Sequence, residues 1–176
     1  VQAKPRRAGD DAERAIDARN AFIMTSIMRD VVRFGTGARA MQLKRQDLAG
    51  KTGTTNDQVD AWFTGFNPGL VAVAWIGFDQ PRSMGGAETG AQAALPIWMG
   101  YMGKALKGVP EADLVVPEGV ATVKINPQSG RRVSDGSEGI LEYFYQENIP
   151  AEQTGFFEGL FGGGGTSAEE VKDQLF

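Results

Sequence analysis

Residues 49–55, with the sequence AGKTGTT, decide how this chain is interpreted, because no other stretch gathers so many reactive side chains. We predict that this stretch forms an extended strand at the edge of a sheet. Side chains alternate along a strand, so Thr52 and Thr54 would share one face, and Lys51 and Thr55 the other. A cation, two hydroxyls and bare glycine backbone along one groove are suited to holding a carboxylate and an oxyanion.

An amphipathic helix is predicted before this strand. Asp17 or Asn20 can cap its N-terminus, and Gly35 and Gly37 are placed to end it. Apolar residues recur at spacings of three and four, which predicts one buried stripe: Phe22, Ile23, Ile27, Met28, Val31 and Val32. Residues 38–48 are predicted to be a polar connection to the motif strand.

Two more strands are predicted after the motif. Alternate residues of the first, 61–66, face the same way: Trp62, Thr64 and Phe66. An Asn-Pro-Gly turn at 67–69 leads into residues 70–78, which are apolar throughout. Such a run is typical of a strand covered on both faces, and the tight turn makes the pair an antiparallel hairpin. The motif strand is therefore expected to be the outermost of the three.

A second helix is predicted from about Ala94 to Gly108, with Pro96 in its first turn. One stripe of this helix is expected to pack on the sheet: Ile97, Trp98, Tyr101, Met102, Ala105 and Leu106. The predicted fold class is therefore α/β (α+β), an antiparallel sheet flanked by helices.

Composition divides the chain into four parts. Residues 1–16 are predicted to be a linker or surface loop, and residues 17–108 the main domain. Residues 109–150 are predicted to be a small β-rich appendage with strands at 120–125 and 140–145. Residues 151–176 are expected to form a flexible, Gly-rich acidic tail, with a linker at 162–165 and a short helix capped by Ser167 and Glu170.

The composition also excludes several kinds of chemistry. The sequence has no histidine and no cysteine, which removes Ser-His-Asp triads, thiolate nucleophiles and His-based metal sites. Any general base must be a lysine or a carboxylate, and we expect no metal or cofactor. The net charge of −4 gives no basic surface for nucleic acid. We expect no signal peptide or membrane segment here, and the start at Val1 suggests a piece of a longer protein.

The residues Gly-Lys-Thr at 50–52 also match the end of a phosphate-binding P-loop. That motif requires a glycine at position 45, which is occupied by Arg45. The P-loop also opens a helix, whereas Gly53, Asn56 and Asp57 are poor helix formers. We therefore reject this alternative. Lys-Thr-Gly by itself occurs by chance in roughly one chain in twenty or thirty of this length, so its surroundings must carry the interpretation.

With those surroundings, the sequence resembles the transpeptidase domain of class A penicillin-binding proteins, and it fits best the 1A type of Gram-negative bacteria. The resemblance is strong over residues 17–106 and weaker to residue 150. It is carried by five segments: NAFIMTS at 20–26, GTGARA at 35–40, AGKTGTTN at 49–56, DAWF at 60–63 and ALPIW at 94–98.

The resemblance implies that residues 17–108 are the C-terminal part of a serine D,D-transpeptidase domain, which cross-links peptidoglycan stem peptides and is acylated by β-lactams. Lys51 would orient hydroxyls beside the nucleophile, and the Thr52 and Thr54 hydroxyls would hold the substrate carboxylate. The backbone N–H of Thr54 would be an oxyanion donor, and Gly53 would let the substrate backbone come close. Asp60 and Trp62 could either shape the cleft or serve the fold.

By the same resemblance, the parent protein would also carry a glycosyltransferase domain and a membrane anchor, on the periplasmic face of the inner membrane. The family's nucleophile, however, is missing from this chain. Neither Ser-x-x-Lys nor Ser-x-Asn occurs at any of its serines: Ser26, Ser83, Ser129, Ser134, Ser137 and Ser167.

We therefore expect the chain alone to be inactive, with the upstream part of the domain as its partner. Without those upstream strands, the strand at 70–78 would be left with an open edge. An alternative interpretation is a non-catalytic binding module on the same scaffold. A soluble hydrolase that shares Lys-Thr-Gly is disfavoured by the Thr-Thr continuation and by the appendage.

Overall fold

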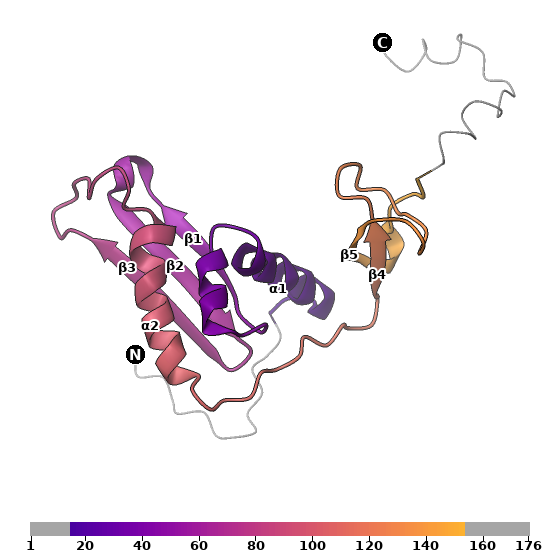
Figure 1. Ribbon diagram of the computed structural model, residues 1–176, viewed down its shortest axis with the longest axis horizontal. Coiled ribbons are helices and arrows are strands. Elements are labelled where there is room, and N and C mark those ends of the chain that lie inside the picture. The colour runs from indigo at the N-terminus through magenta and orange to yellow at the C-terminus, as the bar shows by residue number, and fades with distance from the viewer. Residues whose placement is uncertain (1–14, 154–176) are drawn as a thin grey trace, which may run out of the picture. The chain divides into compact units, whose positions relative to one another are not determined.

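A three-stranded antiparallel sheet carries the motif (Figure 1). Its strands are β1 (Ala49–Thr54), β2 (Asp60–Asn67) and β3 (Leu70–Gly77), in the order β1-β2-β3. A two-residue turn joins β2 to β3, with Asn67 opposite Leu70. The predicted hairpin and the edge position of the motif strand are both confirmed.

The computed structural model describes residues 15–153, which fall into two compact units divided after Val120. The predicted linker before residue 15 lies outside the described residues. So does the tail from residue 154, with its 162–165 linker and Ser167 cap. The four-part division of the chain stays a prediction. Within residues 15–153, no helix is both long enough and apolar enough to cross a membrane.

Of the two capping residues predicted, Asp17 or Asn20, it is Asp17 that caps helix α1 (Ala18–Arg33), and its side chain accepts a hydrogen bond from the Arg19 N–H at 2.9 Å. Its apolar stripe is only partly buried: Phe22 and Val32 are covered, but Ile27 is 52% exposed. The helix contacts β1 at the edge of the sheet, so the described residues cover only part of its apolar face.

Residues 38–48 are more than the polar connection predicted. They include a 3₁₀ helix at Ala38–Leu43, and Ala40 and Leu48 are completely or almost completely buried. The pattern did not predict this helix because two short 3₁₀ turns are too short to show an apolar periodicity.

The second predicted helix starts earlier than expected, as a π-helical turn at Gly90–Ala94 that continues into α2 (Leu95–Ala105). Helix α2 contacts β2 and β3 (Figure 1). Half of its predicted stripe is core, because Trp98, Met102 and Leu106 are buried. For the other half, the prediction of burial is wrong within the described residues. Ile97 and Tyr101 are each 53% exposed, and Ala105 is also exposed.

Phe63 and Trp98 form the centre of the core. Both are buried, and their rings meet edge to face with centroids 4.9 Å apart. The indole Nε1–H of Trp98 donates to the carbonyls of Gly65 (3.2 Å) and Ala72 (3.1 Å). A Cβ at Gly65 would lie 2.5 Å from the Trp98 ring and 2.8 Å from the Phe63 ring, so glycine is required for this contact.

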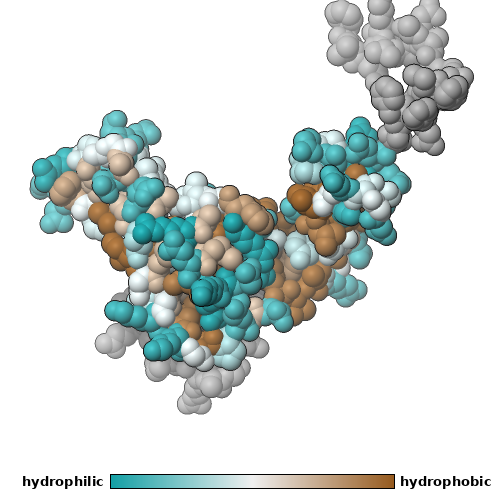
Figure 2. Space-filling model, in the orientation of Figure 1, coloured by the Kyte–Doolittle hydropathy of each residue, from teal (hydrophilic) through white to brown (hydrophobic). Residues whose placement is uncertain are grey.

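Strand β3 has one uncovered face and one unpaired edge in the described residues. Val71, Val73 and Trp75 are 66%, 56% and 45% exposed, so the prediction of cover on both faces is wrong here. The apolar side chains of this run would be stabilised by burial, but no other part of residues 15–153 covers this face. In Figure 2, apolar surface is visible along the β3 side of the sheet. The predicted open edge is confirmed, because β3 ends the strand order.

The second unit contains the small β structure that the sequence predicted. Strands β4 (Val120–Ile125) and β5 (Ile140–Tyr145) form a two-stranded sheet, followed by a 3₁₀ turn at Gln146–Asn148. After β4, the side-chain oxygen of Asn126 accepts hydrogen bonds from the backbone N–H groups of residues 128 and 129. This pattern stabilises the predicted turn.

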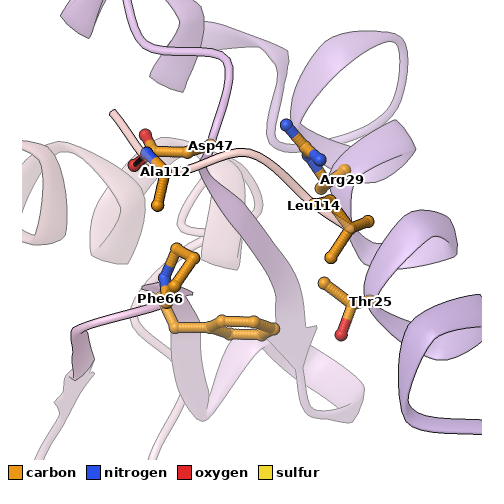
Figure 3. A pocket seen from close by; sticks show the side chains of 7 residues that line it. Thr25, Arg29, Asp47, Phe66, Ala112 and Leu114 are labelled. Carbon is orange, nitrogen blue, oxygen red and sulfur yellow. Dashed lines mark hydrogen bonds between the residues drawn. The ribbon is translucent and has the colours of Figure 1, made fainter. Parts of the chain in front are cut away.

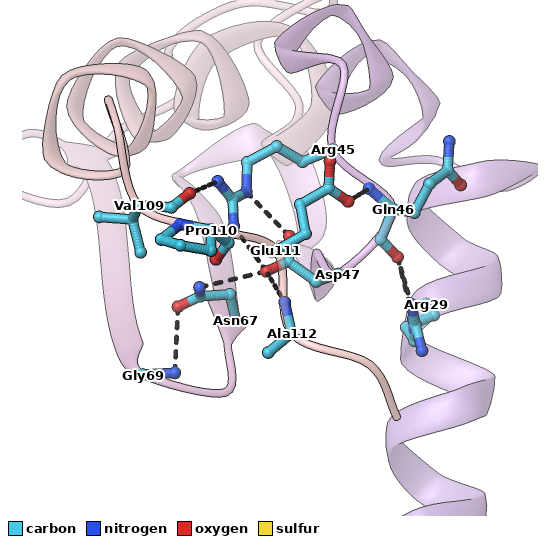
Figure 4. Close-up of polar contacts among 10 residues, drawn as sticks. All are labelled: Arg29, Arg45, Gln46, Asp47, Asn67, Gly69, Val109, Pro110, Glu111 and Ala112. Atoms are coloured by element: carbon cyan, nitrogen blue, oxygen red, sulfur yellow. Dashed lines mark hydrogen bonds and ion pairs between the residues drawn. The ribbon is translucent and has the colours of Figure 1, made fainter. Parts of the chain in front are cut away.

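A buried ion pair holds residues 109–114, here termed the strap, beside the start of β1 (Figure 4). The Arg45 guanidinium makes two hydrogen bonds to the Asp47 carboxylate, at 2.7 and 2.8 Å. It also donates to the carbonyls of Val109 (2.7 Å) and Pro110 (3.2 Å). One arginine therefore joins the strap to the residues that lead into β1.

The strap also closes a pocket of about 200 Å³ against α1 and the β2–β3 turn (Figure 3). The pocket is lined by Thr25, Arg29, Asp47, Phe66, Pro68, Ala112 and Leu114. Arg29 is anchored there by donating from Nε to the Gln46 carbonyl at 3.1 Å.

The Asp47 carboxylate is held in its ionised form. Burial alone would raise its pKa, but hydrogen bonds from Arg45, the Asn67 side chain and the Ala112 N–H, together with the charge of Arg45, outweigh that effect. The pKa of Asp47 therefore lies below its usual value, and hydrogen bonding to Asp47 raises the pKa of Arg45.

We predict that Asp47→Asn will lower the free energy of unfolding by about 3 kcal/mol, because it leaves the Arg45 charge buried without its partner. Urea denaturation at pH 7 measures this. A depressed folded pKa means that the carboxylate's contribution is complete above its unfolded pKa of about 3.9 and is lost as pH falls through the folded pKa. The wild type should therefore lose more stability than Asp47→Asn across that acidic window.

The matched control is Asp113→Asn, since Asp113 lies in the same strap and is exposed. It should leave both the stability and its pH dependence unchanged. Equal losses in the two variants would contradict the role given to Asp47.

Candidate functional site

Strand β1 presents the predicted site residues along the outer edge of the sheet. Thr52 and Thr54 lie opposite Phe63 and Ala61 of β2, which are buried on the helix-covered face, whereas Lys51 lies opposite Thr64 on the other face. The alternation predicted from the sequence is confirmed. Lys51 is exposed, and its ammonium donates to the Thr52 carbonyl at 2.9 Å, with a longer contact of 3.4 Å to the Thr52 hydroxyl.

The Thr52 hydroxyl has a second partner that lies outside the motif. The Oγ1 atoms of Thr36 and Thr52 are 2.8 Å apart, and either can be the donor. Thr36 belongs to the glycine-flanked turn after α1, and it is exposed. The ammonium of Lys51 and the hydroxyls of Thr36 and Thr52 therefore form one continuous polar row.

The Thr54 hydroxyl is held by the start of the π-helical turn. The backbone N–H of Gly90 donates to Thr54 Oγ1 at 3.0 Å. A Cβ at Gly90 would lie 2.6 Å from the Gly53 carbonyl oxygen and 2.4 Å from that of Trp62. Gly90 therefore packs directly on the peptide unit that joins Gly53 to Thr54, and it leaves the Thr54 hydroxyl proton available to a ligand.

The backbone N–H of Thr54 points to the open edge of the sheet. Thr55 donates its own N–H to the Asp60 carbonyl at 3.1 Å, across the β1–β2 connection. N–H directions alternate along a strand, so the N–H of Thr54 is directed away from β2. A backbone donor at that edge is suitably placed to bind a developing oxyanion.

Thr55 and Asp60 close the connection between the strands rather than line the site. The Asp60 N–H donates to the Thr55 hydroxyl at 2.8 Å, around the short 3₁₀ turn Asn56–Gln58. The Asp60 carboxylate accepts a hydrogen bond from Trp75 Nε1 at 2.8 Å. Of the two roles left open for Asp60, these contacts support the structural one.

Thr36 and Gly90 are the residues that sequence reasoning missed as parts of the site. The sequence pattern places Thr36 only in the segment that follows the first helix, and no pattern singles out Gly90. Their partners lie 16 and 36 residues away, and local spacing cannot reveal contacts at those separations. Three acidic residues grouped to hold a metal ion do not occur in the part of the chain that the structure describes.

Known proteins resemble this chain in both sequence and structure. Residues 6–97 match the family described as "Penicillin binding protein transpeptidase domain". The chain is 49% identical over 153 residues to Penicillin-binding protein 1A of Pseudomonas aeruginosa, covering 86% of this chain and 19% of that protein. It is 56% identical over 122 residues to the protein of the same name from Neisseria flavescens, covering 69% of this chain and 15% of that protein.

A crystal structure of Penicillin-Binding Protein 1A from Haemophilus influenzae has the same fold, with a TM-score of 0.75 and 34% identity. The match covers 81% of this chain and 22% of that one. The chain therefore spans about a fifth or less of the length of the curated relatives named above.

We predict that Gly90→Ala will lower the free energy of unfolding by about 1–3 kcal/mol, because its methyl group would overlap the backbones of β1 and β2. Thermal or urea denaturation measures this. Gly86→Ala is the matched control, since a Cβ at Gly86 would have no neighbour within 4 Å. If both variants were equally stable, Gly90 would not hold β1.

Proposed function

The chain belongs to the penicillin-binding-protein transpeptidase family, and we propose that β1 forms one wall of the active site of a serine D,D-transpeptidase. In this proposal the enzyme cross-links peptidoglycan stem peptides and is acylated by β-lactams. The observation that carries it is the row of donors on the exposed edge of β1, which combines the Lys51 ammonium, the hydroxyls of Thr52 and Thr54, and the edge-directed N–H of Thr54.

Each part of this row has a proposed role. The hydroxyls of Thr52 and Thr54 bind the substrate carboxylate, and Lys51 adds positive charge beside them. The Thr54 N–H is one oxyanion donor, a kind of contact whose loss costs about 10²–10³ in rate. Gly53 allows close approach of the substrate backbone, and a Cβ there would make a tight contact of 3.2 Å with the Trp62 Cβ.

The nucleophile comes from the upstream part of the domain. No serine in this chain begins a Ser-x-x-Lys motif, so the wall in β1 needs a second wall that carries the serine and its lysine. The unpaired edge and uncovered face of β3 support an upstream partner that adds strands there. The setting proposed for the parent protein is the periplasmic face of the bacterial inner membrane, with a glycosyltransferase domain in the same chain.

We predict that a form of the protein extended upstream of Val1 will be labelled by a fluorescent penicillin, and that Lys51→Ala will slow labelling by about 10²-fold. The physical reason is the loss of positive charge next to the nucleophile and the carboxylate site. Labelling kinetics on denaturing gels, together with melting temperatures, provide the measurement.

Lys104→Ala is the control, because Lys104 is an exposed lysine on α2. It should be labelled like the wild type. A folded extended protein that is never labelled would instead favour a binding module without chemistry on the same scaffold.

The proposed upstream partner can be tested at Val73. Val73→Thr should cost little in the present chain, where the side chain is 56% exposed. In the extended form it should cost about 1–3 kcal/mol, because a hydroxyl would become buried beside the added strands. Val115→Thr is the control, because Val115 follows the strap directly and is 81% exposed. Urea denaturation of both forms is the measurement. Equal costs at Val73 in the two forms would argue against cover of β3 by the upstream part.

A further inference from the structure

We propose that Thr36 is a positioning residue that orients the Thr52 hydroxyl toward the carboxylate of the substrate. This inference rests on the proposed function, because it assigns a role within the same site. The two hydroxyl oxygens are 2.8 Å apart, although the residues come from different segments, one from the turn after α1 and one from β1.

The turn that carries Thr36 is fixed by its two flanking glycines. The N–H groups of Gly35 and Gly37 both donate to the Val31 carbonyl, at 3.2 and 3.0 Å. A Cβ at Gly35 would lie 2.9 Å from the Val31 Cα, and one at Gly37 would lie 3.3 Å from the Phe63 ring. The backbone on both sides of Thr36 is therefore packed against the fold, which places the hydroxyl at Thr52 although the side chain is exposed.

The role of this contact follows from the protons and lone pairs of the three groups. A threonine hydroxyl has one proton and two lone pairs, and a lysine ammonium can only donate. Lys51 therefore uses Thr52 Oγ1 as an acceptor, and the proton of Thr52 has two alternatives. It can point to Thr36, or Thr36 can donate to Thr52 and leave that proton for a ligand.

A carboxylate selects the second alternative, because it can only accept hydrogen bonds. With Thr36 and Lys51 both donating to the Thr52 oxygen, its remaining proton is directed at the ligand, and no hydrogen bond is lost in the change. Donation by two partners also polarises the Thr52 O–H group and strengthens its bond to a charged acceptor. The ligand class that benefits is one with a free carboxylate beside its reactive carbonyl.

The test compares two probes on the extended form of the protein: a fluorescent penicillin with its free carboxylate, and the same compound as its methyl ester. Thr36→Val should slow acylation by the free acid about tenfold, as expected for weakening a hydrogen bond to a charged group. Acylation by the ester should be unchanged. Thr36→Ser, which keeps the hydroxyl, should restore the wild-type preference for the free acid.

Thr25→Val is the matched control, because the Thr25 hydroxyl donates to the Ala21 carbonyl at 2.7 Å, which is a contact within α1. It should leave the rates with both probes unchanged. If Thr36→Val slowed both probes equally, or slowed neither, the role of Thr36 would be overturned. Either result would leave the Lys51-dependent labelling, and with it the proposed function, unaffected. A wild-type extended protein that neither probe labels would overturn the proposed function and this inference together.

Discussion

The position of every proposed site residue depends on the packing of the Phe63 ring. Glycines from three segments make room for it: a Cβ at Gly37, Gly50 or Gly65 would lie 3.3, 2.8 or 2.8 Å from ring atoms of Phe63. One of these glycines follows Thr36 and another precedes the motif lysine. The same buried ring therefore sets the distance between the α1 exit and β1, and with it the contact between their hydroxyls. Interiors packed this closely transmit small changes of volume to their neighbours.

Trp98 extends this constraint to the other end of the motif. Its ring lies against Gly65 and its indole N–H bonds to two strand carbonyls, so α2 has one position on the sheet. The π-helical turn that precedes α2 then brings Gly90 onto the peptide between Gly53 and Thr54. Turns of this type often occur at functional sites, where the extra residue in the turn re-aims the backbone. Here the turn directs a backbone N–H at the Thr54 hydroxyl.

The sequence predicted the parts of this arrangement that depend on local pattern. Alternation in the motif strand and the turn after β2 were enough to place β1 at the sheet edge with its side chains on the correct faces. Thr36 and Gly90 were not predicted as site residues, because their contacts are between segments and have no spacing of their own. The exposure of Val73 and Ile97 was not predicted either. An apolar pattern indicates that a surface is buried in the folded protein, but it does not show whether the residues that bury it belong to the same stretch of chain.

A site built largely from backbone and short hydroxyl side chains requires a strand that cannot shift, and β1 is fixed at both ends. Before its first residue, Asp47 joins Arg45, Asn67 and the strap in one buried cluster, and after its last residue Thr55 bonds to Asp60. These restraints all lie within residues 15–153. In the proposed enzyme, the wall that binds the carboxylate is therefore organised before the nucleophile is added, so that little ordering free energy is spent when the substrate binds.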